Sequence, residues 1–149
     1  MKFQFDKKRI EEGMNFQAYY NLTDKLVAEG KTTGPNQSDE LAHYTKLNLS
    51  RMKRLAKTTS LNDVLIEKIS HVKSRIYFLV ISEAWCGDAA QNVPLIAKAA
   101  EFSSNIELKI ILRDENLDIM DTFLTNGGRS IPKVIAIDAE SLEVMGEWG

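Results

Sequence analysis

Residues 82–94 read SEAWCGDAAQNVP and contain Cys86, the only cysteine of the 149-residue chain. An apolar run at 76–81 precedes this stretch, and an alanine-rich segment at 89–102 continues it. The first is an uninterrupted run of β-forming residues, which predicts a central strand covered on both faces. The second predicts a helix. Cys86 is therefore expected at a strand-to-helix junction, where the unpaired N–H groups of a helix N-terminus favour a thiolate.

Beyond this junction, strands and helices alternate along the chain. The hydrophobic patterns predict strands at 106–112, 132–137 and 142–148, and a helix at 116–124. A turn at 138–141 joins the last two strands, which are expected to pair antiparallel. This order predicts an α/β fold with a central mixed four-stranded sheet flanked by helices.

The N-terminal part has a helical pattern. One helix is predicted from about residue 7 to residue 29, where Gly30 ends it. A second helix is predicted from the N-cap Ser38 to about residue 57, and a short third helix from the N-cap Ser60. The cations of the segment 46–57 suit either anion binding or a solvated helix face, and we favour the solvated face.

Composition excludes several classes of function. The net charge of −2 gives no electrostatic case for nucleic acid or a membrane surface as partner. The apolar run at 76–81 is too short to span a membrane, and the N-terminus has no apolar core typical of a signal peptide. One cysteine and two histidines exclude an internal disulfide and a Cys/His metal site, so we expect no metal and no cofactor. A reducing cytoplasm is predicted, and the oligomeric state stays open.

Three segments together resemble the thioredoxin family. The stretch Trp85-Cys86-Gly87-Asp88-Ala89 resembles the thioredoxin active site, Trp-Cys-Gly-Pro-Cys. Pro94 matches the proline that kinks the active-site helix of thioredoxins, and Gly128-Arg129-Ser130-Ile131-Pro132 resembles their Gly-Ile-Pro segment. The resemblance implies a thioredoxin-like fold. The chain is similar to a small bacterial subgroup of thioredoxin-like proteins that carries an N-terminal extension. In this chain the site has a single cysteine.

The resemblance covers residues 60–149, which gives an expected division of the chain. Residues 1–59 would be a helical extension packing on the core, and 60–149 the thioredoxin-like domain. Thioredoxins finish with a helix packed on the sheet, and no such segment follows the last predicted strand. Either an N-terminal helix takes that place or the native chain continues past Gly149, and we favour the second.

The resemblance also implies roles for the site residues. In the family, the proline that Pro132 matches is cis and faces the reactive cysteine, which leaves the backbone of Ile131 available to an extended substrate. Gly87 would let a partner's backbone approach, and Trp85 would supply an apolar wall. A helix N-terminus lowers the pKa of a thiol, so we expect a lowered pKa for Cys86.

The departures from the family indicate a site for one thiol. Ala89 stands where thioredoxins carry the resolving cysteine, and Val80 where they bury a carboxylate six residues before the first cysteine. Asp88 brings negative charge close to the thiol, which makes the expected drop in pKa smaller. Lys133, just after the proline, is interpreted as an exposed lysine.

Two functions remain open. Cys86 could be a monothiol nucleophile, used in thiol–disulfide exchange or in redox sensing, that passes through a mixed disulfide or a sulfenic acid and is resolved by an external thiol. Its partner would be a protein or a low-molecular-weight thiol or disulfide. Alternatively, the domain could be a redox-inactive adaptor that binds an extended peptide in a groove between Trp85 and Ile131-Pro132. An iron–sulfur role is disfavoured, because Asp88 would lie beside an anionic cluster and no tripeptide-thiol site is visible.

Overall fold

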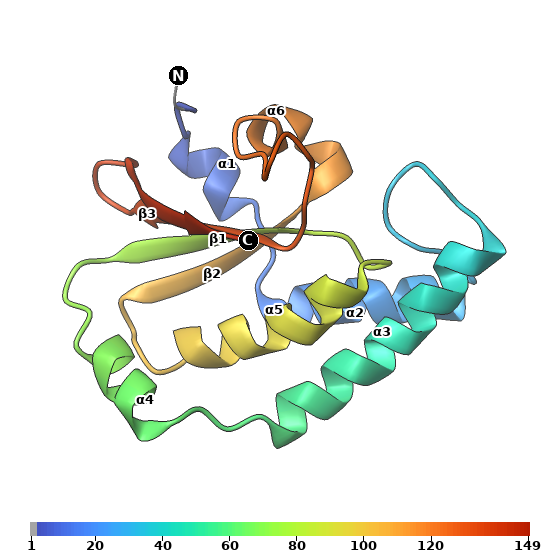
Figure 1. Ribbon diagram of the computed structural model, residues 1–149, viewed down its shortest axis with the longest axis horizontal. Coiled ribbons are helices and arrows are strands. Elements are labelled where there is room, and N and C mark those ends of the chain that lie inside the picture. Colours follow the sequence, from blue (N-terminus) through green and yellow to red (C-terminus); the bar gives the residue numbers. More distant parts are fainter. Residues whose placement is uncertain (1–2) are drawn as a thin grey trace.

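The computed structural model describes residues 3–149 and is built on a four-stranded mixed sheet (Figure 1). The strand order is β2-β1-β3-β4. β1 pairs parallel with β2 and antiparallel with β3, which pairs antiparallel with β4. The strands are β1 Ile76–Ser82, β2 Ile106–Leu112, β3 Lys133–Asp138 and β4 Val144–Trp148. The predicted α/β fold with a mixed four-stranded sheet is confirmed.

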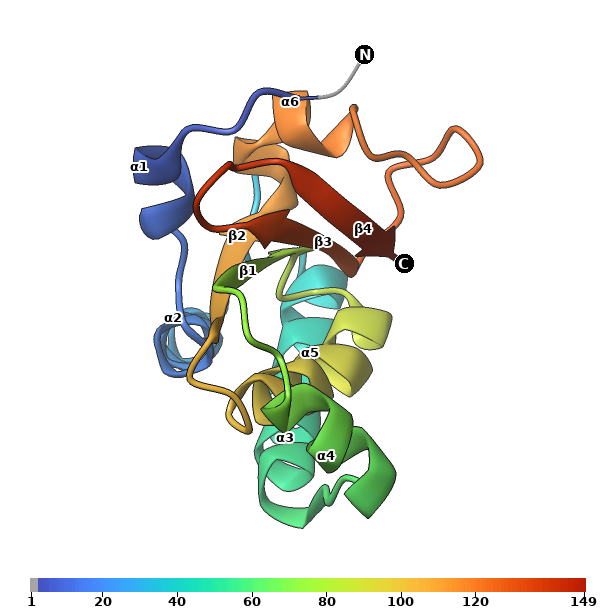
Figure 2. The same ribbon diagram turned by 90° about the vertical axis from the view of Figure 1, so that its left-hand side faces the viewer.

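Helices cover both faces of the sheet. Figures 1 and 2 show α2, α3 and α5 on one face, and α1 and α6 on the other. The helices are α1 Lys7–Glu11, α2 Phe16–Ala28, α3 Asp39–Thr58, α4 Asp63–Ser70, α5 Gly87–Ala100, the 3₁₀ helix η1 Arg113–Glu115, and α6 Leu117–Met120. Because each face of the sheet is apolar, each needs such a cover to exclude water.

Two hydrophobic cores result, one on each side of the sheet. Along β1, Leu79 and Ile81 point into the core beneath α1 and α6, while Val80 points into the core beneath α2, α3 and α5. Successive side chains of a strand point to opposite faces, so a central strand covered twice needs apolar residues at every position. These three residues are at most 1% exposed, which confirms the prediction of a central strand from its sequence.

The single helix predicted from residue 7 to residue 29 is wrong. The structure has two helices there, separated at Gly13–Asn15. Met14 forms an antiparallel bridge with Ile110, its N–H donating to the Ile110 carbonyl at 2.8 Å. This bridge covers the free edge of β2. The side chain of Asn15 then accepts a hydrogen bond from the N–H of Ala18 at 2.8 Å and starts α2.

Other boundaries differ in smaller ways. Ser38 caps α3 as predicted, accepting from the N–H of Leu41 at 3.1 Å. The cap of α4 is Asn62 rather than Ser60, because the Asn62 side chain accepts from the N–H of Leu65 at 2.8 Å. Of the helix predicted at 116–124, only the four residues Leu117–Met120 are α-helical. They form α6, and turns follow them.

Candidate functional site

The thiol of Cys86 lies between the start of α5 and the loop before β3. Cys86 is the N-cap of α5, and its Sγ accepts from the N–H of Ala89 at 3.5 Å. The same thiol donates to the carbonyl oxygen of Ile131 at 3.6 Å. The Ile131–Pro132 bond is cis, as the resemblance implied. Residues 45 positions apart in the chain therefore meet at the sulfur.

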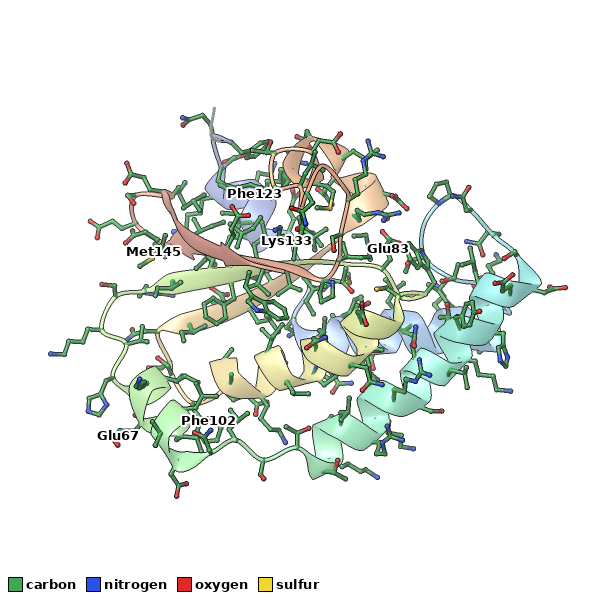
Figure 3. All side chains as sticks on the ribbon, viewed as in Figure 1. Glu67, Glu83, Phe102, Phe123, Lys133 and Met145 are labelled. Atoms are coloured by element: carbon green, nitrogen blue, oxygen red, sulfur yellow. The ribbon has the colours of Figure 1, made fainter. Side chains whose placement is uncertain are left out.

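Lys133, directly after this loop, is buried rather than exposed. Its side chain is 3% exposed, and Nζ donates to Thr125 Oγ1 at 3.0 Å and to the Gly149 carbonyl at 3.2 Å. An ion pair with Glu147 at 3.2 Å completes its shell. A buried ammonium must be paired and hydrogen-bonded in this way. Figure 3 shows Lys133 within the fold, so the prediction of a plain surface lysine was wrong.

The residues before position 60 hold the loop that carries the thiol. The Thr33 hydroxyl accepts from the N–H of Ala84 at 2.9 Å. From α3, the side-chain amide of Asn48 donates to the carbonyl of Ala84 at 2.9 Å. Asn48 is only 1% exposed, so both backbone groups of Ala84 are bonded by buried side chains. No sequence pattern predicted these contacts, since neither side chain lies near Cys86 in the chain.

A buried carboxylate lies beneath the same loop. Glu83 is 0% exposed, and it accepts from the Thr33 hydroxyl at 2.5 Å and from the N–H of Asp114 at 3.0 Å. Figure 3 shows Glu83 where β1 ends, beneath the loop that precedes α3. Burial raises the pKa of Glu83, with the charge of Asp114 acting in the same direction, while the two hydrogen bonds lower it.

This carboxylate was missed by the sequence reasoning. Val80, at the position where thioredoxins bury an acid, is fully buried and apolar as predicted. The sequence analysis considered only position 80 for such an acid and did not consider Glu83, which lies three residues before Cys86 and is buried. Its hydrogen-bond partners are Thr33 and Asp114 rather than the thiol. An ionisable residue directly after an apolar strand was the only available signal.

Trp85 forms one wall of the site. Its ring is partly buried against the core that underlies α1 and α6, and the guanidinium carbon of Arg113 lies 5.0 Å from the ring centroid. Arg113 also pairs with Asp114, with Nε 3.0 Å from Oδ1. A guanidinium over an indole face is held by cation–π attraction. Beside the thiol there is thus an apolar ring at Trp85 and a cation, Arg113, that was not foreseen.

The first turn of α5 supplies the other wall. Asp88 is exposed, whereas Ala89 is 1% exposed and packed in the core beneath α2 and α3. Gly87 faces Arg51 of α3, because a Cβ placed on Gly87 would lie 3.5 Å from Nη1 of Arg51. Arg51 was considered before only as one cation of the segment 46–57. The structure brings it to the residue next to the thiol.

The pKa of the Cys86 thiol is raised, not lowered as predicted. Burial is the largest cause, since it disfavours the charged thiolate. The N–H groups of Ala89 and Asp88 lower the pKa, the carboxylate of Asp88 raises it, and Arg113 lowers it. The direction expected for Asp88 is correct, but the helix N-terminus does not outweigh desolvation.

Comparison with known proteins identifies the family. A family model described as thioredoxin matches residues 34–149. The chain belongs to the thioredoxin family. The match begins before α3, so the helix that supplies Asn48 and Arg51 lies inside the matched region.

Two solved structures share the fold of this thioredoxin-family chain. The crystal structure of a protein of unknown function from Pseudomonas aeruginosa is 21% identical, with a TM-score of 0.67, over 98% of this chain and 76% of that one. An HIV epitope-scaffold is 23% identical, with a TM-score of 0.66, over 95% of this chain and 74% of that one. At these identities the likeness concerns the fold alone. Among curated proteins, none matches the chain.

Within residues 3–149, the side chains of this thioredoxin-family member make no group of three or more His, Cys, Asp or Glu that could hold a metal ion. In the same range, no helix combines the length and the apolar character that crossing a bilayer requires.

Proposed function

We propose that the protein catalyses thiol–disulfide exchange with Cys86 as its only thiol. The observation that carries this proposal is the position of the sulfur, at the N-cap of α5 and 3.6 Å from the Ile131 carbonyl beside a cis proline. Ala89, at the second-cysteine position, is apolar and 1% exposed. An external thiol must therefore complete the cycle, and Cys86 is the catalytic residue.

The exchange has two balanced steps. Cys86 releases its proton to solvent, and the thiolate attacks one sulfur of a disulfide RSSR. A mixed disulfide Cys86–S–S–R forms, the substrate S–S bond breaks, and the leaving thiolate takes up a proton to give RSH. An external thiol R′SH then attacks the substrate sulfur of the mixed disulfide, which gives RSSR′ and restores the Cys86 thiol. The net reaction is RSSR + R′SH → RSH + RSSR′.

The groups around the sulfur support both steps. The N–H of Ala89 and the charge of Arg113 favour the thiolate, while burial and Asp88 favour the thiol. A raised pKa leaves less thiolate at neutral pH but makes each thiolate a stronger nucleophile. The sheet pairing of β3 begins at Lys133, so the Ile131 backbone lies outside the ladder, which supports a role for it in pairing with an extended substrate.

A redox-inactive adaptor is the second candidate, and the raised pKa of Cys86 favours it. In that role the surface beside Trp85 and Ile131-Pro132 would bind an extended peptide without covalent chemistry. In either role we propose a cytoplasmic protein of the bacterial single-cysteine subgroup. Its partner would be a protein or a low-molecular-weight thiol or disulfide.

The test is a turnover assay. Purified protein is mixed with hydroxyethyl disulfide and an external thiol such as glutathione, and loss of the external thiol is followed. The Cys86→Ser variant and a cysteine-containing peptide of equal thiol concentration are the controls. We expect a rate proportional to protein concentration, above that of the peptide, and absent in the variant. Intact-mass spectrometry should show one adduct, on Cys86, that the external thiol removes.

Two outcomes would contradict exchange. One is a rate per thiol no higher than that of the peptide at the same pH. The other is an adduct that the external thiol does not release. If either is found and the folded Cys86→Ser variant still binds an extended peptide as tightly as the wild type, the adaptor role is supported instead.

A further inference from the structure

Arg51 differs from the other cations of its helix. The remaining basic residues of this segment, Lys46, Lys53, Arg54 and Lys57, are exposed, while Arg51 is partly buried. Its Nη1 donates to Oδ1 of Asn48 at 3.0 Å. These four cations thus lie on a solvated helix face, as expected from the sequence. Arg51 is the exception.

The guanidinium is held by a buried side chain. Asn48 accepts from Arg51 with Oδ1 and donates to the Ala84 carbonyl with Nδ2 at 2.9 Å, and it is 1% exposed. One amide therefore links the cation to the loop that carries the thiol. Because the Asn48 amide is hydrogen-bonded through both its nitrogen and its oxygen, it restricts the positions that the Arg51 guanidinium can adopt. A restricted guanidinium favours recognition of an anion in one place.

The charge of Arg51 has no partner within the fold. No carboxylate of residues 3–149 lies within ion-pair distance of it, whereas Arg113, which lies over the Trp85 ring, is paired with Asp114. Nη1 lies 3.5 Å from the position of a Cβ on Gly87, the residue next to the thiol. A guanidinium can donate two parallel hydrogen bonds to a carboxylate.

We propose that Arg51 binds the carboxylate of a low-molecular-weight disulfide while Cys86 reacts with its sulfur. This inference rests on the proposed exchange function and names its substrate class. Nη1 of Arg51 lies beside Gly87, the sequence neighbour of Cys86, so the proposed carboxylate would be attached within a few bonds of the reacting sulfur. A cysteine inside a polypeptide has an amide at that place. A small disulfide with free carboxylates has the required anion.

Asp88 is the opposing charge at this site. It is exposed on the first turn of α5, and no ion pair joins it to the described cations. Its carboxylate repels an anionic substrate, and Arg51 attracts it. Replacing either residue should therefore change the preference for anionic disulfides, in opposite directions.

The experiment compares two small disulfides of similar length. Dithiodipropionate carries a carboxylate two carbons from each sulfur, and hydroxyethyl disulfide carries a hydroxyl instead. The rate of mixed-disulfide formation at Cys86 is measured for each by stopped reactions and mass spectrometry, and divided by the rate of a simple thiol with the same disulfide. The variants are Arg51→Gln, Arg51→Lys, Asp88→Asn and, as the matched control on the exposed face of α3, Arg54→Gln.

We expect the wild type to prefer the dianion by roughly tenfold, the effect of one charge-assisted pair. Arg51→Gln should lose this preference, because its rate should fall far more with the dianion than with the neutral disulfide. Arg51→Lys should retain part of the preference, and Arg54→Gln should behave as the wild type. Asp88→Asn should increase it. A high salt concentration should reduce it.

Two results separate the failure of this inference from failure of the proposed function. If Cys86 reacts with both disulfides at the same normalised rate, and Arg51→Gln changes nothing, the carboxylate site is wrong while exchange stands. If Cys86 reacts with neither disulfide faster than a simple thiol does, the exchange function itself fails. An equal loss for both disulfides in a folded Arg51→Gln variant would show a structural role only, and would also overturn the inference.

Discussion

The Cys86 thiol lies 3.6 Å from the carbonyl oxygen of Ile131, across 45 positions of sequence. The contact joins the start of α5 to the loop before β3, and it gives the thiol an acceptor while the sulfur is protonated. This contact and the burial that raises the pKa of Cys86 both favour the neutral thiol over the thiolate. Each of the following experiments tests part of this arrangement.

The pH dependence of alkylation should report the raised pKa. The rate of Cys86 modification by iodoacetamide should still be rising at a pH where an unfolded control has levelled off, because burial disfavours the thiolate. Asp88→Asn should move the midpoint down, and Arg113→Gln should move it up. A midpoint below that of the unfolded protein would show that the helix N-terminus outweighs burial.

A second cysteine should convert the site to dithiol chemistry. The wild type should not sustain reduction of insulin disulfides by dithiothreitol above the uncatalysed rate. Ala89→Cys should, since the N–H of Ala89 already lies 3.5 Å from the Cys86 sulfur. Ala100→Cys, at the far end of α5 and also buried, is the control for an added thiol. Robust insulin reduction by the wild type would contradict the assignment of a single-thiol site.

The buried carboxylate of Glu83 should make stability depend on pH. Its pKa is raised in the folded state, so that state binds more protons than the unfolded chain between the two pKa values. The contribution of Glu83 to the free energy of unfolding is therefore complete below about pH 4 and is lost as pH rises through the raised pKa. Urea unfolding at several pH values should show this slope in the wild type.

The Glu83→Gln variant should lack this pH dependence of the unfolding free energy. Asp114, Arg113 and Thr33 are present in both proteins, so their effects are common to both curves. Glu83→Ala should cost about 1–3 kcal/mol at neutral pH, because the Thr33 hydroxyl and the Asp114 N–H lose a buried acceptor. Parallel curves for the wild type and Glu83→Gln would rule out titration of this group.

Gly34 tests how closely the loop before α3 approaches these carboxylates. Its φ is +87°, and a Cβ there would lie 3.2 Å from Asp114 Oδ2 and 3.3 Å from Glu83 Oε1. Gly30 has a φ of +69° but no atom within 4 Å of such a Cβ. Both alanine variants should lose about 1–2 kcal/mol from backbone strain. Gly34→Ala should lose about 1 kcal/mol more through crowding, and equal losses in thermal unfolding would exclude this crowding.

The sequence by itself determined the sheet and the motif. The uninterrupted apolar run of β1 predicted a strand buried on both faces, because side chains alternate between faces and both must avoid water. The stretch around Cys86 and the Ile131-Pro132 segment indicated the thioredoxin family, and the family model matches residues 34–149. Local periodicity and short motifs predict the strand and the family because both depend on residues that are neighbours in the chain.

Only the tertiary structure decided the environment of the thiol. The break at Met14 depends on a bridge to Ile110, and burial of Lys133 depends on acceptors from three distant positions. Thr33, Asn48 and Arg51 reach the loop around Cys86 from the segment that the sequence assigned to a helical extension packing on the core. The pKa of a thiol depends on how much water and which charges surround it, and long-range packing fixes both.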